Sequence, residues 1–346
     1  MSVVNETSDP AALICCGQLC DSSSAIFTYR TIMAFTRATL YTIGIISNCL
    51  AFIVIHLMKL RGSSILYLEM LAVADCVNCL TGLFGRELNM LSKRFPLEYI
   101  RYNHIYQQFY RYVYLYVDAI FQMTTSTSSW LLFALSLDRY VAIRFPLSAR
   151  NICTIRNAFR VSLATWVLTF IFDLPTIWDL ETYFTMPDQP CKYVLPRKLL
   201  LQNKEYALYY DFVFGKVVLK FIPGLIVLGC NVHMAALVRL AARLRHKLQQ
   251  IDVKDELSTN SKQGRQITLT ILALNVVFMV EYGMSLINTF IPAVLPDGYT
   301  YRPYHSGQLL HAINAMINLF VYLGIRRGFG ETLVWFLSCK RLGNRV

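Results

Sequence analysis

Residues 38–58 read ATLYTIGIISNCLAFIVIHLM, and this stretch holds no acidic or basic side chain except His56 near its end. About 20 mainly apolar residues, wound as a helix, cross the ~30 Å hydrocarbon core of a bilayer. Within lipid such a segment must be helical, because every backbone N–H and C=O group has to be hydrogen-bonded inside the protein. The stretch therefore predicts a membrane-spanning helix.

Six further stretches of this kind follow along the chain, at roughly 64–88, 106–141, 158–178, 208–238, 264–292 and 305–325. Of the 346 residues, 55% are hydrophobic and 16% are charged, whereas soluble chains carry about a quarter charged residues. We therefore expect an all-α membrane protein, a bundle of seven transmembrane helices over residues 38–325, preceded by an amino-terminal segment over residues 1–37.

Lysine and arginine are concentrated in one set of the predicted connecting segments, namely 59–63, 142–157, 239–265 and 326–346. Since basic loops stay in the cytoplasm, we expect the amino terminus outside the cell and the carboxyl terminus inside. The sequon at Asn5 agrees, because glycosylation needs an asparagine outside the cytoplasm. The net charge of +12 then faces anionic lipid and cytoplasmic partners, and no nucleic-acid partner is expected.

Polar side chains recur at set places in these helices, where they are costly and therefore typical of functional positions. In chain order the landmarks are Asn48, Asp75, Asp138-Arg139-Tyr140 (which continues as VAIRFPL), the apolar-helix residues Trp166 and Pro223, and then Asn318 and Tyr322. In order and spacing these landmarks resemble those of the rhodopsin-like (class A) G-protein-coupled receptors, across nearly the whole chain. The resemblance implies a plasma-membrane receptor that is not an enzyme.

The resemblance also implies roles for single residues. Arg139 would be the switch residue that Asp138 holds at rest and that turns toward a heterotrimeric G protein on activation. Tyr140 belongs to the same motif, Leu147 would contact the G protein, and Tyr322 would move inward to support the active state. Residues 326–346 would form a short amphipathic helix 8, which begins near Phe329, and a cytoplasmic tail.

Two further implications concern ions and lipids. Asp75, Ser128, Asn314 and Asn318 match the positions that hold a sodium ion in the resting bundle, and a carboxylate with neutral oxygens suits such a hard cation. No metal other than sodium is expected. Retinal is excluded, because Ala312 occupies the position of the lysine that binds it. Cys339 is a palmitoylation site in this interpretation, with a buried free thiol as the alternative.

The chain departs from the family at several positions. Tyr114 replaces the usual helix 3 cysteine, so Cys191 is expected to pair with one of Cys15, Cys16 and Cys20, or else to stay free. Helix 6 reads Glu281-Tyr282-Gly283, without the usual tryptophan and proline. Helix 7 lacks the proline after Asn318, and Asn231 replaces a tyrosine on helix 5.

The predicted ligand pocket is polar and aromatic. Its expected contacts are Asp118, Phe121, Gln122, Lys220, Glu281, Tyr282, Tyr304, Gln308 and His311. Mixed charges with aromatic faces suit a short peptide, although Lys220 could also extend toward the lipid interface. The segment from Trp130 to Thr154 resembles invertebrate neuropeptide receptors, including the FMRFamide type.

A short extracellular neuropeptide is therefore the expected ligand. The altered helices 6 and 7 leave open a chemosensory or constitutively active receptor. A transporter or channel is a more distant alternative, which would show repeated halves with interrupted helices; the sequence has no such repeat.

Overall fold

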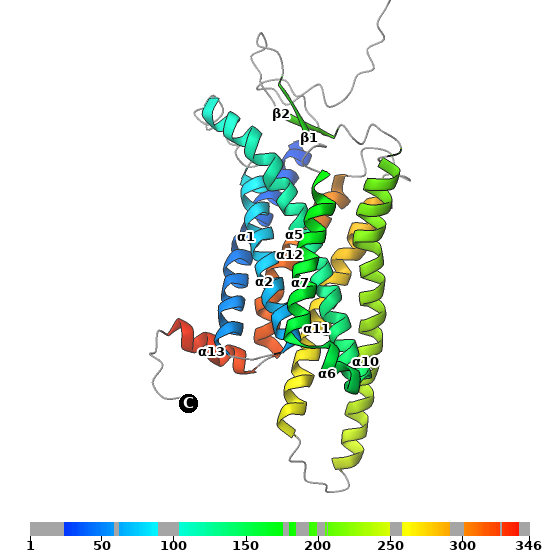
Figure 1. Ribbon diagram of the computed structural model, residues 1–346. Coiled ribbons are helices and arrows are strands. Elements are labelled where there is room, and N and C mark those ends of the chain that lie inside the picture. Colours follow the sequence, from blue (N-terminus) through cyan, green and yellow to red (C-terminus); the bar gives the residue numbers. More distant parts are fainter. Residues whose placement is uncertain are drawn as a thin grey trace, which may run out of the picture.

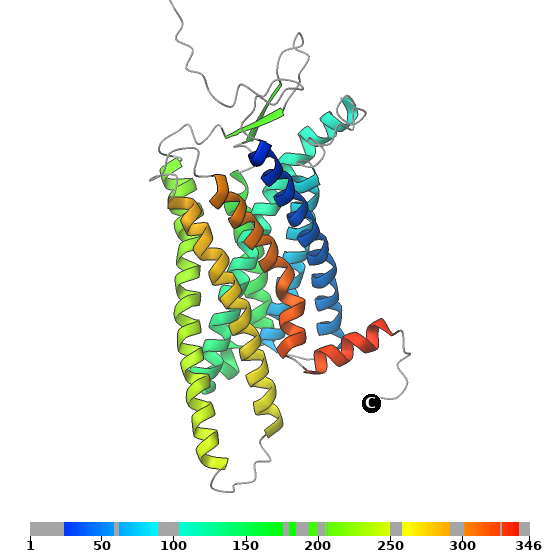
Figure 2. The same cartoon turned by 180° about the vertical axis from the view of Figure 1, so that it is seen from behind.

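The computed structural model describes residues 24–58, 62–88, 104–175, 180–184, 194–198, 205, 207–249, 258–290, 301–325 and 327–338. The described residues form seven long helical segments that run side by side (Figures 1 and 2). These are α1 (Ser24–Leu57), α2 (Ser63–Thr81) with its continuation η1 (Gly82–Glu87), α5 (His104–Arg144), α7 (Ile155–Asp173), η3 (Ala207–Phe221) with α10 (Ile222–Gln249), α11 (Ser258–Phe290) and α12 (Tyr301–Ile325). The predicted seven-helix bundle is confirmed.

Short elements lie at both ends of the bundle (Figure 1). At one end, β1 (Leu180–Phe184) pairs antiparallel with β2 (Val194–Lys198). At the other end lie α6 (Pro146–Ile152), the tips of α10 and α11, and the helix 8 segment α13 (Arg327–Leu337). A bend of 101° separates α13 from α12. The hairpin is an addition to the all-α fold that we predicted.

The apolar side chains separate into a buried core and an outer face. The core cluster includes Leu71, Leu131, Leu135 and Leu274, which come from α2, α5 and α11. On α7, in contrast, most large apolar side chains point outward and are exposed, among them Phe159, Leu163, Val167, Phe170 and Ile171. Large exposed apolar faces are rare on soluble proteins, so this outer face is the expected contact with lipid.

Helix α1 begins at Ser24, well before the predicted start of the span at residue 38. Arg37 directly precedes the uncharged run 38–58. In the structure the Arg37 side chain is only 2% exposed, and its Nε lies 2.7 Å from Glu87 Oε1 on η1. The cation is thus paired inside the bundle, and by length and hydropathy the candidate membrane span of α1 extends from Thr31 to Leu57.

Helix α5 contains a hydroxyl-rich run, TTSTSS at residues 124–129. Four of its hydroxyls, those of Thr124, Thr125, Thr127 and Ser129, donate to carbonyl groups one turn earlier, as Thr127 does to Met123 O at 2.8 Å. Thr127 also lies 2.7 Å from the hydroxyl of Thr169 on α7. The polar groups are therefore satisfied within the bundle, so a helix of modest hydropathy fits inside it.

Candidate functional site

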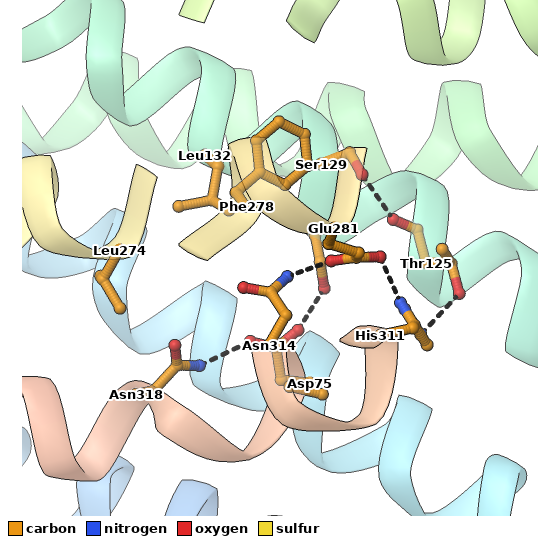
Figure 3. Close-up of a pocket in the computed structure, with 12 residues that line it drawn as sticks. Asp75, Thr125, Ser129, Leu132, Leu274, Phe278, Glu281, His311, Asn314 and Asn318 are labelled. Atoms are coloured by element: carbon orange, nitrogen blue, oxygen red, sulfur yellow. Dashed lines mark hydrogen bonds and ion pairs between the residues drawn. The ribbon is translucent and has the colours of Figure 1, made fainter. Parts of the chain in front are cut away.

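Asp75 joins three helices in the middle of the bundle (Figure 3). The Oγ of Ser128 on α5 donates a hydrogen bond to its Oδ1 at 2.5 Å, and the Nδ2 of Asn318 on α12 donates to its Oδ2 at 2.6 Å. The Nδ2 of Asn318 also donates to Asn48 Oδ1 on α1 at 3.1 Å. Hydrogen bonds to a carboxylate are among the stronger ones, so Asp75 ties α2 to both α5 and α12.

Glu281 and His311 form a second polar group beside Asp75 (Figure 3). His311 Nδ1 lies 2.6 Å from Glu281 Oε1, and Asn314 Nδ2 donates to Glu281 Oε2 at 2.6 Å. On its other side, His311 Nε2 lies 2.9 Å from Asn78 Oδ1. Both ring nitrogens face oxygen acceptors, an arrangement that the imidazolium form satisfies with two donated hydrogen bonds. Helices α11, α12 and α2 are linked through this group.

Both groups line one small cavity. Its polar walls are Asp75, Thr125, Ser128, Ser129, Glu281, His311, Asn314 and Asn318, and its apolar walls are Leu132, Leu274, Phe278 and Ala315. The centre of a water molecule has about 10 Å³ in which to lie, which is about the room that one water requires. Carboxylate, hydroxyl and amide oxygens are the donors that a hard cation prefers, so the chemistry of the walls fits the predicted sodium ion.

The four predicted sodium ligands thus lie around the same cavity, but Asn314 donates to Glu281 rather than to Asp75. Glu281 and His311, which are predicted ligand contacts, also line this cavity, and Glu281 is a second carboxylate in its wall. Their role as ligand contacts stays a prediction. Glu281 is the single acidic residue of α11, and this was its signal in the sequence.

A charged cluster lies nearer the hairpin end of the bundle and centres on Arg86 of η1. Its Nε and Nη2 donate to Asp118 Oδ1 on α5 at 2.9 and 2.7 Å, and its Nη1 donates to Gln308 Oε1 on α12 at 3.1 Å. The guanidinium carbon lies 3.9 Å from the ring centroid of Phe121. Three predicted ligand contacts therefore meet at Arg86, which was not among the predicted contacts and whose partners lie far from it in the sequence.

The remaining predicted ligand contacts are Tyr282, Gln122, Lys220 and Tyr304. Tyr282 is buried, and its ring stacks on Phe278 at 5.9 Å between centroids. Gln122 is half-buried on α5. The side chains of Lys220 and Tyr304 lie outside the part of the structure that is described.

The predicted switch residues lie at the opposite end, next to α6. Arg139 Nη2 lies 2.8 Å from Asp138 Oδ2. The same Oδ2 accepts hydrogen bonds from the hydroxyls of Ser63, at 2.9 Å, and Ser64, at 2.6 Å, at the start of α2. These two serines were not predicted, because nothing in the sequence indicates a contact with Asp138, which lies 75 and 74 residues further along the chain.

The remaining switch residues surround this pair. Leu147 on α6 is 83% exposed. The Tyr140 ring lies 5.4 Å from that of His233 on α10, and Tyr322 is buried against Phe329 of α13, with 5.5 Å between ring centroids. Leu147 is therefore open to a partner, whereas Tyr322 is packed in the core.

The asparagine that replaces a family tyrosine on α10 has a specific contact. Asn275 Nδ2 on α11 donates to Asn231 Oδ1 at 2.7 Å and to Ser136 Oγ on α5 at 2.8 Å. This polar link joins α5, α10 and α11.

We expect that the double variant Ser63→Ala/Ser64→Ala raises signalling in the absence of ligand. A hydrogen bond to a charged group contributes about 1.5–3 kcal/mol, so losing the two that hold the Asp138 carboxylate in place should shift the equilibrium between resting and active states by about a hundredfold or more. Basal second-messenger output at equal surface expression is the measurement. Ser338→Ala, at an exposed serine after α13, is the control. Unchanged or reduced basal output would contradict the prediction.

We expect that Gly224→Ala destabilises the contact between α10 and α11. A Cβ atom at Gly224 would lie 2.6 Å from Cε1 and Cζ of the Tyr282 ring, and overpacking of this kind costs about 1–3 kcal/mol. Gly229→Ala on the same helix, where a Cβ would meet nothing within 4 Å, is the matched control. Thermal unfolding in detergent should show a lower Tm for the first variant only, and equal Tm values would refute the prediction.

Several predicted modification sites lie outside the described residues. These are Asn5, Cys15, Cys16, Cys20, Cys191 and Cys339. The cysteines whose state the structure describes, Cys49, Cys76, Cys79, Cys153 and Cys230, are free thiols. The glycosylation, disulfide and palmitoylation sites therefore stay predictions.

Comparison with known proteins places the chain in a family. Residues 47–324 match the family described as 7 transmembrane receptor (rhodopsin family). Among similar proteins, the FMRFamide receptor of Drosophila melanogaster is 25% identical over 313 residues, which cover 87% of this chain and 52% of that receptor. Galanin receptor 2a of Danio rerio is 24% identical over 236 residues (66% of this chain, 60% of the relative). Neuromedin-U receptor 1 of Rattus norvegicus is 26% identical over 324 residues (86% of this chain, 72% of the relative).

The chain thus spans about half the length of the FMRFamide receptor. The family match, in contrast, covers the described helices from the middle of α1 to the end of α12. It includes Asp75, the Asp138-Arg139-Tyr140 motif and Asn318. The chain belongs to the rhodopsin family of seven-transmembrane receptors, which are multi-pass membrane proteins.

Proposed function

We propose that this chain is a plasma-membrane receptor that binds a short extracellular neuropeptide and activates a heterotrimeric G protein. The observation that carries the proposal is the contact at the end of α5, where Arg139 pairs with Asp138 and Asp138 is bonded to both Ser63 and Ser64. A ligand that favours the active state would shift the equilibrium away from this contact. Arg139 and the exposed Leu147 would then meet the G protein.

The peptide is supported by the relatives and by the charges of the bundle. The three relatives named above are receptors for neuropeptides. Arg86, Asp118 and Gln308 offer a peptide both donors and acceptors, next to the aromatic ring of Phe121.

The proposed orientation has residues 1–37 outside the cell and residues 326–346 inside. The basic segment 142–157 includes α6, and 326–346 includes α13, and both helices lie at the same end of the bundle (Figure 1). Basic segments on one side of a membrane favour the cytoplasmic side. The Arg139 switch then faces the cytoplasm, and the Arg86 cluster faces the extracellular end.

We also propose that Asp75, Ser128, Asn314 and Asn318 hold a sodium ion in the resting state. The cavity that these residues share is lined by oxygen atoms that can act as metal ligands. It has room for about one water. An ion bound only at rest would oppose activation, because it stabilises the state to which it binds. No other cofactor, and no retinal, belongs to the proposal.

The test is second-messenger output, calcium and cyclic AMP, in cells that express the chain and receive a library of short amidated peptides. A saturable response that Arg139→Ala abolishes at equal surface expression is the expected result. Arg156→Ala, at an exposed arginine near the start of α7, is the matched control and should respond normally. No response to any peptide, with normal surface delivery, would count against a peptide receptor.

A chemosensory or constitutively active receptor is the second proposal. It is favoured by the unusual interior, in which Glu281 and His311 line the cavity and Asn275 links α11 to Asn231. Signalling by the unstimulated chain, compared with Arg139→Ala at equal expression, distinguishes the two. High basal output that peptides do not increase would favour this second function.

A further inference from the structure

Arg86 engages only one of the two carboxylate oxygens of Asp118. Both Nε and Nη2 of Arg86 converge on Oδ1 of Asp118. No donor on the described residues meets Oδ2. The two side chains retain 17% and 13% exposure, so both stay partly accessible.

The cluster is electrically balanced but strongly dipolar. One cation and one anion lie in contact at 2.7 Å, so their net charge is zero, and Gln308 adds a neutral amide that accepts from Nη1 at 3.1 Å. A ligand group with a net charge would give the cluster an uncompensated charge. A neutral group with one donor and one acceptor would add hydrogen bonds to the cluster and leave its net charge at zero.

We infer that this cluster recognises the primary carboxamide at the carboxyl end of an amidated peptide. The amide N–H₂ would donate to Asp118 Oδ2, and the amide oxygen would accept from the Arg86 guanidinium. The Phe121 ring, 3.9 Å from the guanidinium carbon, holds the arginine flat beside that position. The inference rests on the proposed peptide-receptor function and specifies the peptide class and the residues that bind its carboxyl-terminal amide.

Two other ligand groups fit less well. A cationic group would have to displace Arg86 from Asp118, and breaking a buried ion pair is costly because one charge loses its partner. A free carboxylate could meet Arg86 but would bring a second negative charge against Asp118, and like charges at an interface are strongly unfavourable. The neutral amide binds without breaking the pair, so the cluster discriminates between amide and acid.

The test compares each peptide with its free acid. The probes are the tetrapeptide Phe-Met-Arg-Phe-amide and the other amidated library peptides, each beside the same sequence with a free carboxyl end. For the wild-type receptor we expect the amide to be more potent by about tenfold or more, since a hydrogen bond to a charged group is worth that much in affinity. In Asp118→Asn the potency ratio should fall toward one, because the repulsion of the acid is lost.

Two double variants serve to distinguish a lost contact from misfolding. Arg86→Gln/Asp118→Asn replaces the ion pair by neutral amides and should also lose the discrimination while it keeps surface delivery. Arg37→Met/Glu87→Met removes another arginine–carboxylate pair of the same region, whose side chains are 2% and 3% exposed and so face the interior. This matched control should retain the wild-type ratio.

The possible outcomes separate the inference from the function on which it rests. A ratio well above one that collapses only in the Asp118 variants supports the inference. Equal potency of amide and acid at the wild-type receptor, or a ratio that the Asp118 variants retain, overturns it and leaves the peptide receptor in place. If no peptide of either form gives a response at normal surface delivery, the peptide receptor fails and the inference fails with it.

Discussion

Replacing Arg37 by methionine is expected to destabilise the folded receptor by about 3–5 kcal/mol, the usual cost of removing one partner of a buried ion pair. Arg37 Nε lies 2.7 Å from Glu87 Oε1, and Nη2 lies 3.0 Å from Oε2, so the contact is bidentate. Both side chains are almost fully buried, at 2% and 3% exposure. The variant would leave the Glu87 carboxylate inside the bundle without its cation.

Thermal unfolding in detergent micelles measures the effect, and the apparent Tm of Arg37→Met should fall by roughly 10 °C. The double variant Arg37→Met/Glu87→Met should recover most of the loss, because apolar side chains of similar size replace a buried pair at little cost. Arg156→Met, at an exposed arginine of α7, should leave the Tm nearly unchanged. If Arg37→Met is no less stable than Arg156→Met, the pair does not stabilise the bundle.

This pair also explains why the sequence alone did not predict where α1 begins. The apolar run 38–58 was sufficient to place the core of α1, because length and hydropathy are local properties of the chain. The earlier turns of the helix depend on Glu87, which lies 50 residues further along. An arginine counts against a span when it is read alone, and it becomes tolerable only after the bundle brings a carboxylate to it.

The residues of the candidate site likewise fall into those that the sequence predicts and those that it does not. Asp75, Arg139 and Asn318 could be found from the sequence, because a polar residue inside an apolar helix is a local anomaly. Arg86 could not be assigned, because its partners Asp118 and Gln308 lie 32 and 222 residues away. Ser63 and Ser64 carry no signal at all until α2 packs on α5. Contacts between distant segments decided which polar residues form the site.

The final expectation concerns coupling between Glu281 and His311. In a double-mutant cycle of Glu281→Gln and His311→Gln, we expect a coupling energy of about 1.5–3 kcal/mol, the range for hydrogen bonds to charged groups. The two atoms are 2.6 Å apart, and the side chains are 15% and 13% exposed. His311 Nε2 also faces Asn78 Oδ1 at 2.9 Å, so the ring is fixed from both sides and little of the interaction is lost to motion.

His56 and Glu69 offer the same residue types in a different environment. Their atoms are 3.7 Å apart, and the His56 side chain is 75% exposed, so the coupling energy in the cycle His56→Gln, Glu69→Gln should stay below about 1 kcal/mol. Unfolding free energies of the purified receptor supply both cycles. A Glu281–His311 coupling no larger than that of the exposed pair would mean that α11 and α12 are not held together by this contact. The departure from the family at Glu281 would then need another structural reason.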